Sequence, residues 1–330
     1  MENNQDAHYE TKKLHPFSRL LSGRRKEPAL IEIRRAAKKL SDNRLREDAS
    51  GLVQIEPDDM VPETTPAKLL GYYSADGIAY ALRELGVSDI VEQLGFRDFQ
   101  VKVTGDAWCQ LFRINASAEG KTHLIAEGRF RKTSGPLPGD TFLKKEYGEK
   151  AYSLVIIEWF LLQNPLTEFS PHKPQLPEQV FPGLGIKDEV MEILFAVARR
   201  LELDAYILNA MFLHNAFIYS PEFFFCNPKR QAEYLAITRV AQHHSLQDLT
   251  LAVEGGFVYL QGQEKPYRWT GDTMVRPLSK ELSGAYHRYG YRQLVENMAE
   301  AINYHIDWDS FRKHRDALLK KLLDIPPRNK

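Results

Sequence analysis

Apolar residues recur at helical spacing between positions 188 and 201, where the pattern along the chain is clearest. Val190, Leu194, Val197 and Leu201 form one stripe, and residues three or four apart share a face of a helix. This spacing predicts an amphipathic helix that packs one face on a core. Similar spacing, together with capping residues, predicts further helices at 30–40, 74–85, 90–94, 229–242, 291–304 and 308–323.

Strand-like runs occupy much of the chain before that helix. Residues 152–162 form the most apolar run and are rich in β-branched and aromatic side chains, so we expect a central strand there. Shorter apolar or alternating runs predict strands at 99–103, 108–114, 124–131 and 203–210, and a β-hairpin formed by 249–260 and 267–277. Residues 164–182 carry five prolines and no periodicity, which predicts a long extended loop. These elements together favour an α+β fold around a mixed sheet.

The zero net charge of this 330-residue chain hides a strongly basic N-terminal region. Residues 11–46 contain twelve lysines or arginines and three acids, whereas 49–66 are acidic and contain prolines. We therefore expect three parts: a basic, partly disordered N-terminal arm and linker (1–66), a main domain (67–278) and a helical C-terminal extension (279–330). The arm has two interpretations, a contact with nucleic acid or an anionic surface through residues 11–46, or a solvated leader with one docked helix.

The composition favours a globular protein over a disulfide-rich or membrane-spanning one. An apolar content of 43% supports a globular core, and two cysteines are too few for a disulfide framework or a zinc ribbon. The longest apolar run contains Glu158 and is too short to span a bilayer, and the N-terminus lacks the apolar stretch of a secretory signal. We therefore expect a cytoplasmic protein without a transmembrane segment. His243 and His244 lack a third ligand at suitable spacing, so we expect no metal.

A glycine-spaced turn opens the helix at 188–201. It reads Gly183-Leu184-Gly185-Ile186-Lys187-Asp188, and the N–H groups and dipole of a helix N-terminus favour a bound anion. A dinucleotide fingerprint needs a third glycine where Asp188 stands, and no Gly-Lys-Ser/Thr of a nucleotide-binding loop is present. Two interpretations are left, an anion site of another kind and a turn that only caps the helix.

The segment from Pro182 to Phe225 resembles the GNAT superfamily of acyltransferases. In that family an Arg/Gln-Gly-x-Gly-x-Gly/Ala turn follows the fourth strand, and a helix, a strand and a short helix come next. Gly183 and Gly185 match the second and fourth turn positions, and Tyr219 and Phe224 keep the family's five-residue offset. The chain departs from the family pattern at the first turn position (Pro182), at the sixth (Lys187), at Phe223 and in the length of the preceding loop. The resemblance covers about 45 residues well and extends loosely to the earlier strands and helices.

This resemblance implies a GNAT-like sheet, mixed but mainly antiparallel and flanked by helices. It further implies that the chain transfers an acyl group from acetyl-CoA or a longer acyl-CoA, or from an acyl-carrier protein, to an amine acceptor. The residues that it implies for the coenzyme pyrophosphate are those of the turn and a nearby asparagine: Gly183, Leu184, Gly185, Ile186, Lys187, Asp188 and Asn215.

Acyl transfer to an amine needs an acid for the departing thiolate and a base for the amine. The resemblance implies that Tyr219 is the acid. Glu127 and Glu158 are candidate bases, because each lies in a predicted central strand where burial makes a carboxylate a stronger base. Arg129 and Arg131 share a strand face with Glu127 and are expected to neutralise it. His214, close to Tyr219 in sequence, is a further candidate base or substrate contact.

Two other classes of function stay open at this stage. One is a non-catalytic GNAT-like protein that binds or senses a ligand while its basic arm engages a partner. The other is an interaction protein in which the glycine turn has no ligand. The acceptor is not readable from the sequence, because acceptor pockets are built from variable loops.

Overall fold

The structure, a computed structural model, describes residues 27–47, 67–106, 108–139 and 142–323. Its helices are α3 (Glu27–Ala37), α4 (Asp42–Arg46), α5 (Ala75–Glu84), α6 (Val87–Gln93), α7 (Phe142–Tyr147), α8 (Lys187–Arg200), α9 (Leu213–Tyr219), α10 (Pro228–Val240), α11 (Leu246–Gly255), α12 (Lys280–His287), α13 (Tyr289–Ala301) and α14 (Trp308–Leu323). Its strands are β1 (Arg97–Gly105), β2 (Gln110–Ala118), β3 (Lys121–Gly135), β4 (Tyr152–Leu162), β5 (Ala205–Ala210), β6 (Phe224–Phe225), β7 (Val258–Leu260), β8 (Asp272–Pro277) and β9 (Tyr304–Ile306).

Seven of these strands form one mainly antiparallel sheet in the order β1-β2-β3-β4-β5-β8-β6. Its parallel pair is β4 with β5, joined by the crossover helix α8. The predicted central strand 152–162 is β4 and lies in the middle of the sheet, as expected. The α+β class with a mainly antiparallel sheet between helices is therefore confirmed.

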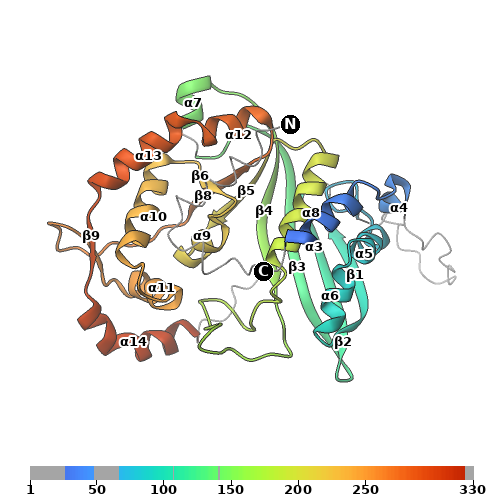
Figure 1. Cartoon of the computed structure of the whole chain (residues 1–330), viewed down its shortest axis with the longest axis horizontal. Coiled ribbons are helices and arrows are strands. Elements are labelled where there is room, and N and C mark those ends of the chain that lie inside the picture. Colours follow the sequence, from blue (N-terminus) through green and yellow to red (C-terminus); the bar gives the residue numbers. More distant parts are fainter. Residues whose placement is uncertain (1–26, 48–66, 107, 140–141, 324–330) are drawn as a thin grey trace.

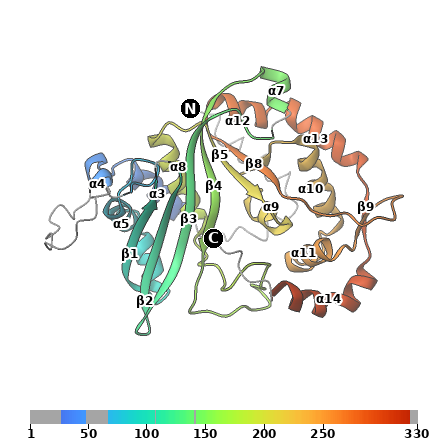
Figure 2. The same cartoon turned by 180° about the vertical axis from the view of Figure 1, so that it is seen from behind.

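Helices cover the two halves of the sheet differently (Figure 1). The helices α3, α5, α6 and α8 gather over one face of β1–β4, where an apolar cluster joins them to β2 and β3. Figure 2 shows the reverse face of β1–β4 with none of the labelled helices in front of it. The helices α10 to α14 gather at the β5-β8-β6 end, and α12 and α13 contribute Leu282, Tyr286 and Val295 to a second cluster there.

The helices of residues 27–47 dock on the main body through specific contacts. Arg34 of α3 makes two hydrogen bonds to the carboxylate of Glu192 in α8, at 2.7 and 2.5 Å. Arg200 of α8 donates to the carbonyls of Ala37 and Leu40, where α3 ends. Gly77 of α5 lies so close to α4 that a Cβ there would stand 2.1 Å from the carbonyl oxygen of Leu45. The described part of the expected basic arm is thus helical and packed, and the rest of the arm lies outside the described residues.

The predicted hairpin of 249–260 and 267–277 is wrong over most of its length, although an isolated antiparallel bridge joins Tyr259 to Pro266 across the predicted turn. Residues 246–255 form α11, β7 pairs with β9, and β8 pairs with β5 and β6. Ser245 caps the start of α11 by accepting from the N–H of Asp248, and Gly256 ends it in the left-handed conformation. The helix α11 is buried over most of its surface, and its buried residues include the polar Gln247 and Thr250, so its sequence shows no clear apolar stripe at helical spacing.

Candidate functional site

The sheet splits between its two parallel strands. β4 and β5 pair from Leu154 with Ala205 to Ile157 with Leu208. Beyond that point β4 continues along β3 as far as Leu162, whereas β5 continues along β8. Figures 1 and 2 both show the two strands diverging toward their carboxyl ends. We call this region the split.

A β-bulge stands where the split begins. On β4, Trp159 pairs with Arg129 and Ile157 pairs with Phe130, so Glu158 is the extra residue. Bulges bend a strand and interrupt its pairing, which accounts for the separation of β4 from β5 at this point. Among the described strands none pairs with residues 158–162 of β4 on the side that faces β5. The strands β4 and β5 are the two parallel strands that α8 connects. Ligands of open sheets commonly bind at the carboxyl ends of such strands, which is where the split lies.

The glycine turn lies at the open end of the split. The N–H of Asn164, just after β4, donates to the carbonyl of Pro182 at 2.7 Å, which ties the turn to the end of the strand. Gly185 has φ +79°, a conformation that favours glycine. Leu184 and Ile186 are buried, and α8 begins at the next residue without a side-chain cap. The prediction that this turn opens a helix is confirmed.

The charges around the turn are mixed. Asp188 and Glu189 lie in the first turn of α8, where they complement the helix dipole. The ammonium group of Lys187 donates to the carbonyl of Ile218 in α9 at 3.2 Å. The turn therefore combines the N-terminal end of a helix with one cation and two carboxylates.

The Lys187 contact brings the turn together with Tyr219, which follows Ile218 at the end of α9. The Tyr219 ring packs edge-on against Phe223, with 5.7 Å between ring centroids. Burial raises the pKa of Tyr219 to about 12, so its hydroxyl is protonated at physiological pH. Tyr219 thus keeps its proton, and its chain neighbour Ile218 contacts the glycine turn through Lys187.

His214 and Asn215 lie one turn earlier in α9. His214 is 4% exposed and stacks on Phe212, with 5.4 Å between ring centroids. Burial lowers the pKa of His214 to about 3, against a smaller opposing effect of Asn215. Such an imidazole is neutral and a weak base, and its Nδ1 is buried without a partner among the described residues. None of the described contacts joins Asn215 to the glycine turn.

The two candidate carboxylates lie on the sheet face opposite α8. Glu127 is fully buried in β3 and pairs with Arg113, its cross-strand neighbour on β2, at 2.6 Å from Nε. Glu158, at the bulge, is exposed and pairs with Arg131 at 3.1 Å. The register of β2 and β3 places Arg113 opposite Glu127 and gives this carboxylate a cation beyond Arg129 and Arg131 of its own strand. Sequence spacing along one strand does not reveal such a cross-strand partner.

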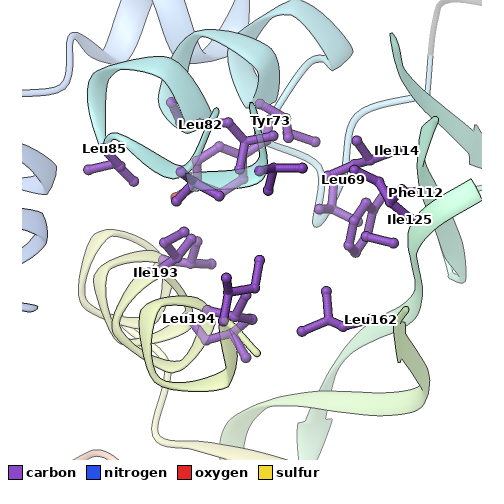
Figure 3. Close-up of a pocket in the computed structure, with 18 of the residues that line it drawn as sticks. Leu69, Tyr73, Leu82, Leu85, Phe112, Ile114, Ile125, Leu162, Ile193 and Leu194 are labelled. Carbon is purple, nitrogen blue, oxygen red and sulfur yellow. The ribbon is translucent and has the colours of Figure 1, made fainter. Parts of the chain in front are cut away.

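An apolar cavity that sequence reasoning missed lies beside the split. Its volume is about 150 Å³, and it is lined by α5, α6, α8, the strands β1–β4 and the segment before α5. Figure 3 shows Leu82 and Tyr73 facing Ile193, Leu194 and Leu162 across it. Each lining residue taken alone looks like ordinary core, and only the packing of helices over the sheet brings them around an empty space.

Three of the basic residues in 27–47 make contacts with the main body. Arg34 pairs with Glu192, and the guanidinium groups of Arg44 and Arg46 lie over the rings of Tyr80 and Tyr72 at 3.8 and 4.2 Å. These three arginines hold α3 and α4 on the body of the protein, which leaves fewer charges for an external partner on this segment.

Within residues 27–47, 67–106, 108–139 and 142–323, no group of three or more His, Cys, Asp or Glu side chains has the arrangement of a metal site. None of the helices in this part of the chain is long and apolar enough to cross a membrane. No model of a known protein family matches the sequence, and no curated protein matches it either.

Proposed function

We propose that this chain is a GNAT-type acyltransferase, which moves an acyl group from a thioester donor to an amine. The observation that carries the proposal is the split between β4 and β5, with the glycine turn and Tyr219 at its open end. The order of elements around the split also agrees with the resemblance read from the sequence: a fourth strand, the turn, a helix, a parallel strand and a short helix.

The split suits the arm that carries the thioester in coenzyme A and in acyl-carrier proteins. This arm is an extended chain with two amide groups, and an extended chain can bond to a strand edge as an added strand does. Residues 158–162 of β4 offer such an edge. The phosphate at the far end of the arm then lies at the glycine turn, against the N-terminus of α8.

Tyr219 is the acid of the proposed reaction. The amine attacks the thioester carbonyl, the C–S bond breaks, and the departing thiolate takes the hydroxyl proton of Tyr219. The attacking amine gives up one proton to a base in the same reaction. Tyr219 later takes up one proton, so that the enzyme returns to its starting state. Of the three candidate bases, Glu158 is best placed to accept the proton of the amine, because it lies at the bulge and is exposed. Glu127 is enclosed and bound to Arg113, and burial makes His214 a weak base.

An acyl-carrier protein is the second candidate donor. Asp188 and Glu189 place two carboxylates in the first turn of α8, where they repel the several phosphate groups of coenzyme A. The arm of a carrier protein bears a single phosphodiester with one negative charge, so the two carboxylates repel it less strongly than they repel coenzyme A. Both donors share the thioester arm and the same chemistry.

Donor binding and thiol release test the proposal. We expect coenzyme A thioesters or an acylated carrier protein to stabilise the folded chain by about 2.7 kcal/mol at 100 times Kd. We also expect one of these donors to release free thiol when a panel of amino acids and other amines is added. Absence of stabilisation with every donor refutes the site, and stabilisation without thiol release points to a non-catalytic binding protein.

A further inference from the structure

The apolar cavity lies directly alongside the edge of β4 that the split exposes. Phe160 and Leu162 belong to this edge and line the cavity, and Leu184 and Ile186 of the glycine turn line it as well. The cavity thus borrows part of its lining from the exposed edge of β4 and from the glycine turn, and Figure 3 shows Leu162 of that edge among the side chains around it.

The lining of this cavity selects for hydrocarbon. Aliphatic and phenylalanine side chains make up almost all of it, with Tyr73 and Ser88 as the exceptions, and it has no charged group. Water needs two to four polar partners to occupy a cavity, so an apolar space of this kind stays dry and accepts apolar ligands. Empty space of this size inside a core is costly, because protein interiors are otherwise close-packed.

We propose that this cavity receives the tail of a medium-length acyl chain, so that the donor is a medium-chain rather than an acetyl thioester. The claim that a thioester carries the alkyl tail rests on the proposed function. The claim that the cavity binds an alkyl chain does not depend on that function. A cavity of about 150 Å³ in another protein accepts benzene, which has six carbons. The cavity accordingly holds roughly six carbons beyond those next to the thioester.

Chain-length dependence of binding is the measurement, made by calorimetry on the full chain. Straight-chain fatty acids of four to twelve carbons are titrated as free acids, and acetyl-, hexanoyl-, octanoyl- and decanoyl-CoA are titrated in parallel. Each methylene that enters the cavity raises affinity about fourfold, the equivalent of about 0.8 kcal/mol. We expect octanoyl-CoA to bind at least 100-fold more tightly than acetyl-CoA, with a gain that levels off once the cavity is full.

A matched pair of variants on α5 locates the binding. Ala81 lines the cavity and Ala79, on the same helix and similarly half-buried, does not. We expect Ala81→Phe to abolish the chain-length dependence and Ala79→Phe to keep it. Ile193→Ala, which enlarges the cavity, provides a second test in case the Ala81→Phe protein does not fold. We expect Ile193→Ala to shift the preferred acyl chain to a greater length.

The outcomes separate this inference from the proposed function. Equal affinity for short and long chains, or chain-length dependence that survives both Ala81→Phe and Ile193→Ala unchanged, overturns the cavity assignment even if the protein transfers acetyl groups. Conversely, chain-dependent binding of free fatty acids that Ala81→Phe removes supports the cavity assignment even if no donor releases thiol.

Discussion

Burial holds two titratable side chains of α9 in their neutral forms at physiological pH. It raises the pKa of Tyr219 to about 12 and lowers the pKa of His214 to about 3. The same physical cause acts in opposite directions because a phenol gains a charge when it loses a proton, whereas an imidazole gains a charge when it takes one up. Tyr219 therefore keeps its proton for donation, and His214 stays uncharged.

Replacing Tyr219 by Phe is expected to remove the proposed acid while keeping the ring that packs on Phe223. Loss of one general acid lowers kcat by about 10²–10⁴-fold, and we expect KM for the donor to change little. Steady-state thiol release measures both constants. A Tyr219→Phe protein with an unchanged kcat contradicts the acid role, and Tyr259→Phe, a tyrosine of the small β7–β9 sheet, serves as the control.

His214 is expected to make the folded protein acid-sensitive. Its folded pKa of about 3 lies below its ordinary value of 6.5, so as pH falls below about 6.5 the unfolded chain takes up a proton that the folded chain does not. This residue thus costs about 1.4 kcal/mol of unfolding free energy per pH unit between about 6.5 and 3. Urea unfolding at several pH values measures the slope. We expect His214→Gln to flatten it and the exposed-site control His172→Gln to leave it unchanged.

The two glycines of the turn before α8 differ in what they require of the backbone. Gly185 adopts φ +79°, whereas a Cβ on Gly183 would meet only the Leu162 carbonyl oxygen at an ordinary 3.7 Å. We expect Gly185→Ala to lower the unfolding free energy by about 1–2 kcal/mol and Gly183→Ala to lower it much less. Chemical unfolding of the pair measures the difference, and equal losses contradict the assigned turn geometry.

The docking of α3 on α8 depends on one charge pair. The Glu192 side chain is 9% exposed and that of Arg34 is 39% exposed, so Arg34→Ala leaves a buried carboxylate without its cation. We expect a loss of about 1–3 kcal/mol in unfolding free energy, which the double variant Arg34→Leu/Glu192→Leu largely restores. Arg35→Ala, at an exposed position of the same helix, is the control. A single variant as stable as this control contradicts the contribution of the pair.

At the scale of the whole molecule, the seven-stranded sheet is continuous at one end of β4 and β5 and divided at the other. The bulge at Glu158 and the turn that begins at Pro182 are both distant in sequence from α9. The contact of Lys187 with Ile218 brings the turn and α9 together in one region of the molecule. This region has the apolar cavity on the α8 side of the sheet and the carboxylate–arginine pairs on the opposite side. In the proposed function, the donor and its acyl tail occupy the face of the sheet that carries the cavity, whereas Glu158 lies toward the other face.

Hydrogen exchange is expected to report the filling of the split. Donor binding should slow amide exchange in peptides that cover 158–162 and 183–189, because the arm bonds the strand edge and its phosphate engages the turn. Peptides that cover 154–157 already pair with β5 and should change little. Mass spectrometry with and without octanoyl-CoA measures the protection, and β1–β2 peptides serve as the internal reference. Uniform protection, or none at 158–162, contradicts donor binding in the split.

The sequence by itself determined the elements whose patterns are local. Alternation and β-branched content placed β4 at 152–162, and helical spacing placed α8 and α14 to within a residue or two. The glycine turn was readable as well, because backbone conformation at Gly185 and the start of a helix depend on neighbouring residues. The segment 246–255 failed for the complementary reason: burial on most sides removed the period that identifies a helix, although Ser245 and Gly256 still marked its ends.

Only the tertiary structure decided which of these residues meet. The pairing of Glu127 with Arg113 follows from the register of β2 and β3, and the split follows from the bulge at Glu158. The cavity follows from the packing of three helices over four strands. Each of these depends on residues that are distant along the chain, and no periodicity within one element encodes them. The sequence therefore determined the turn and its helix, whereas the fold decided that Tyr219 and an apolar space stand beside them.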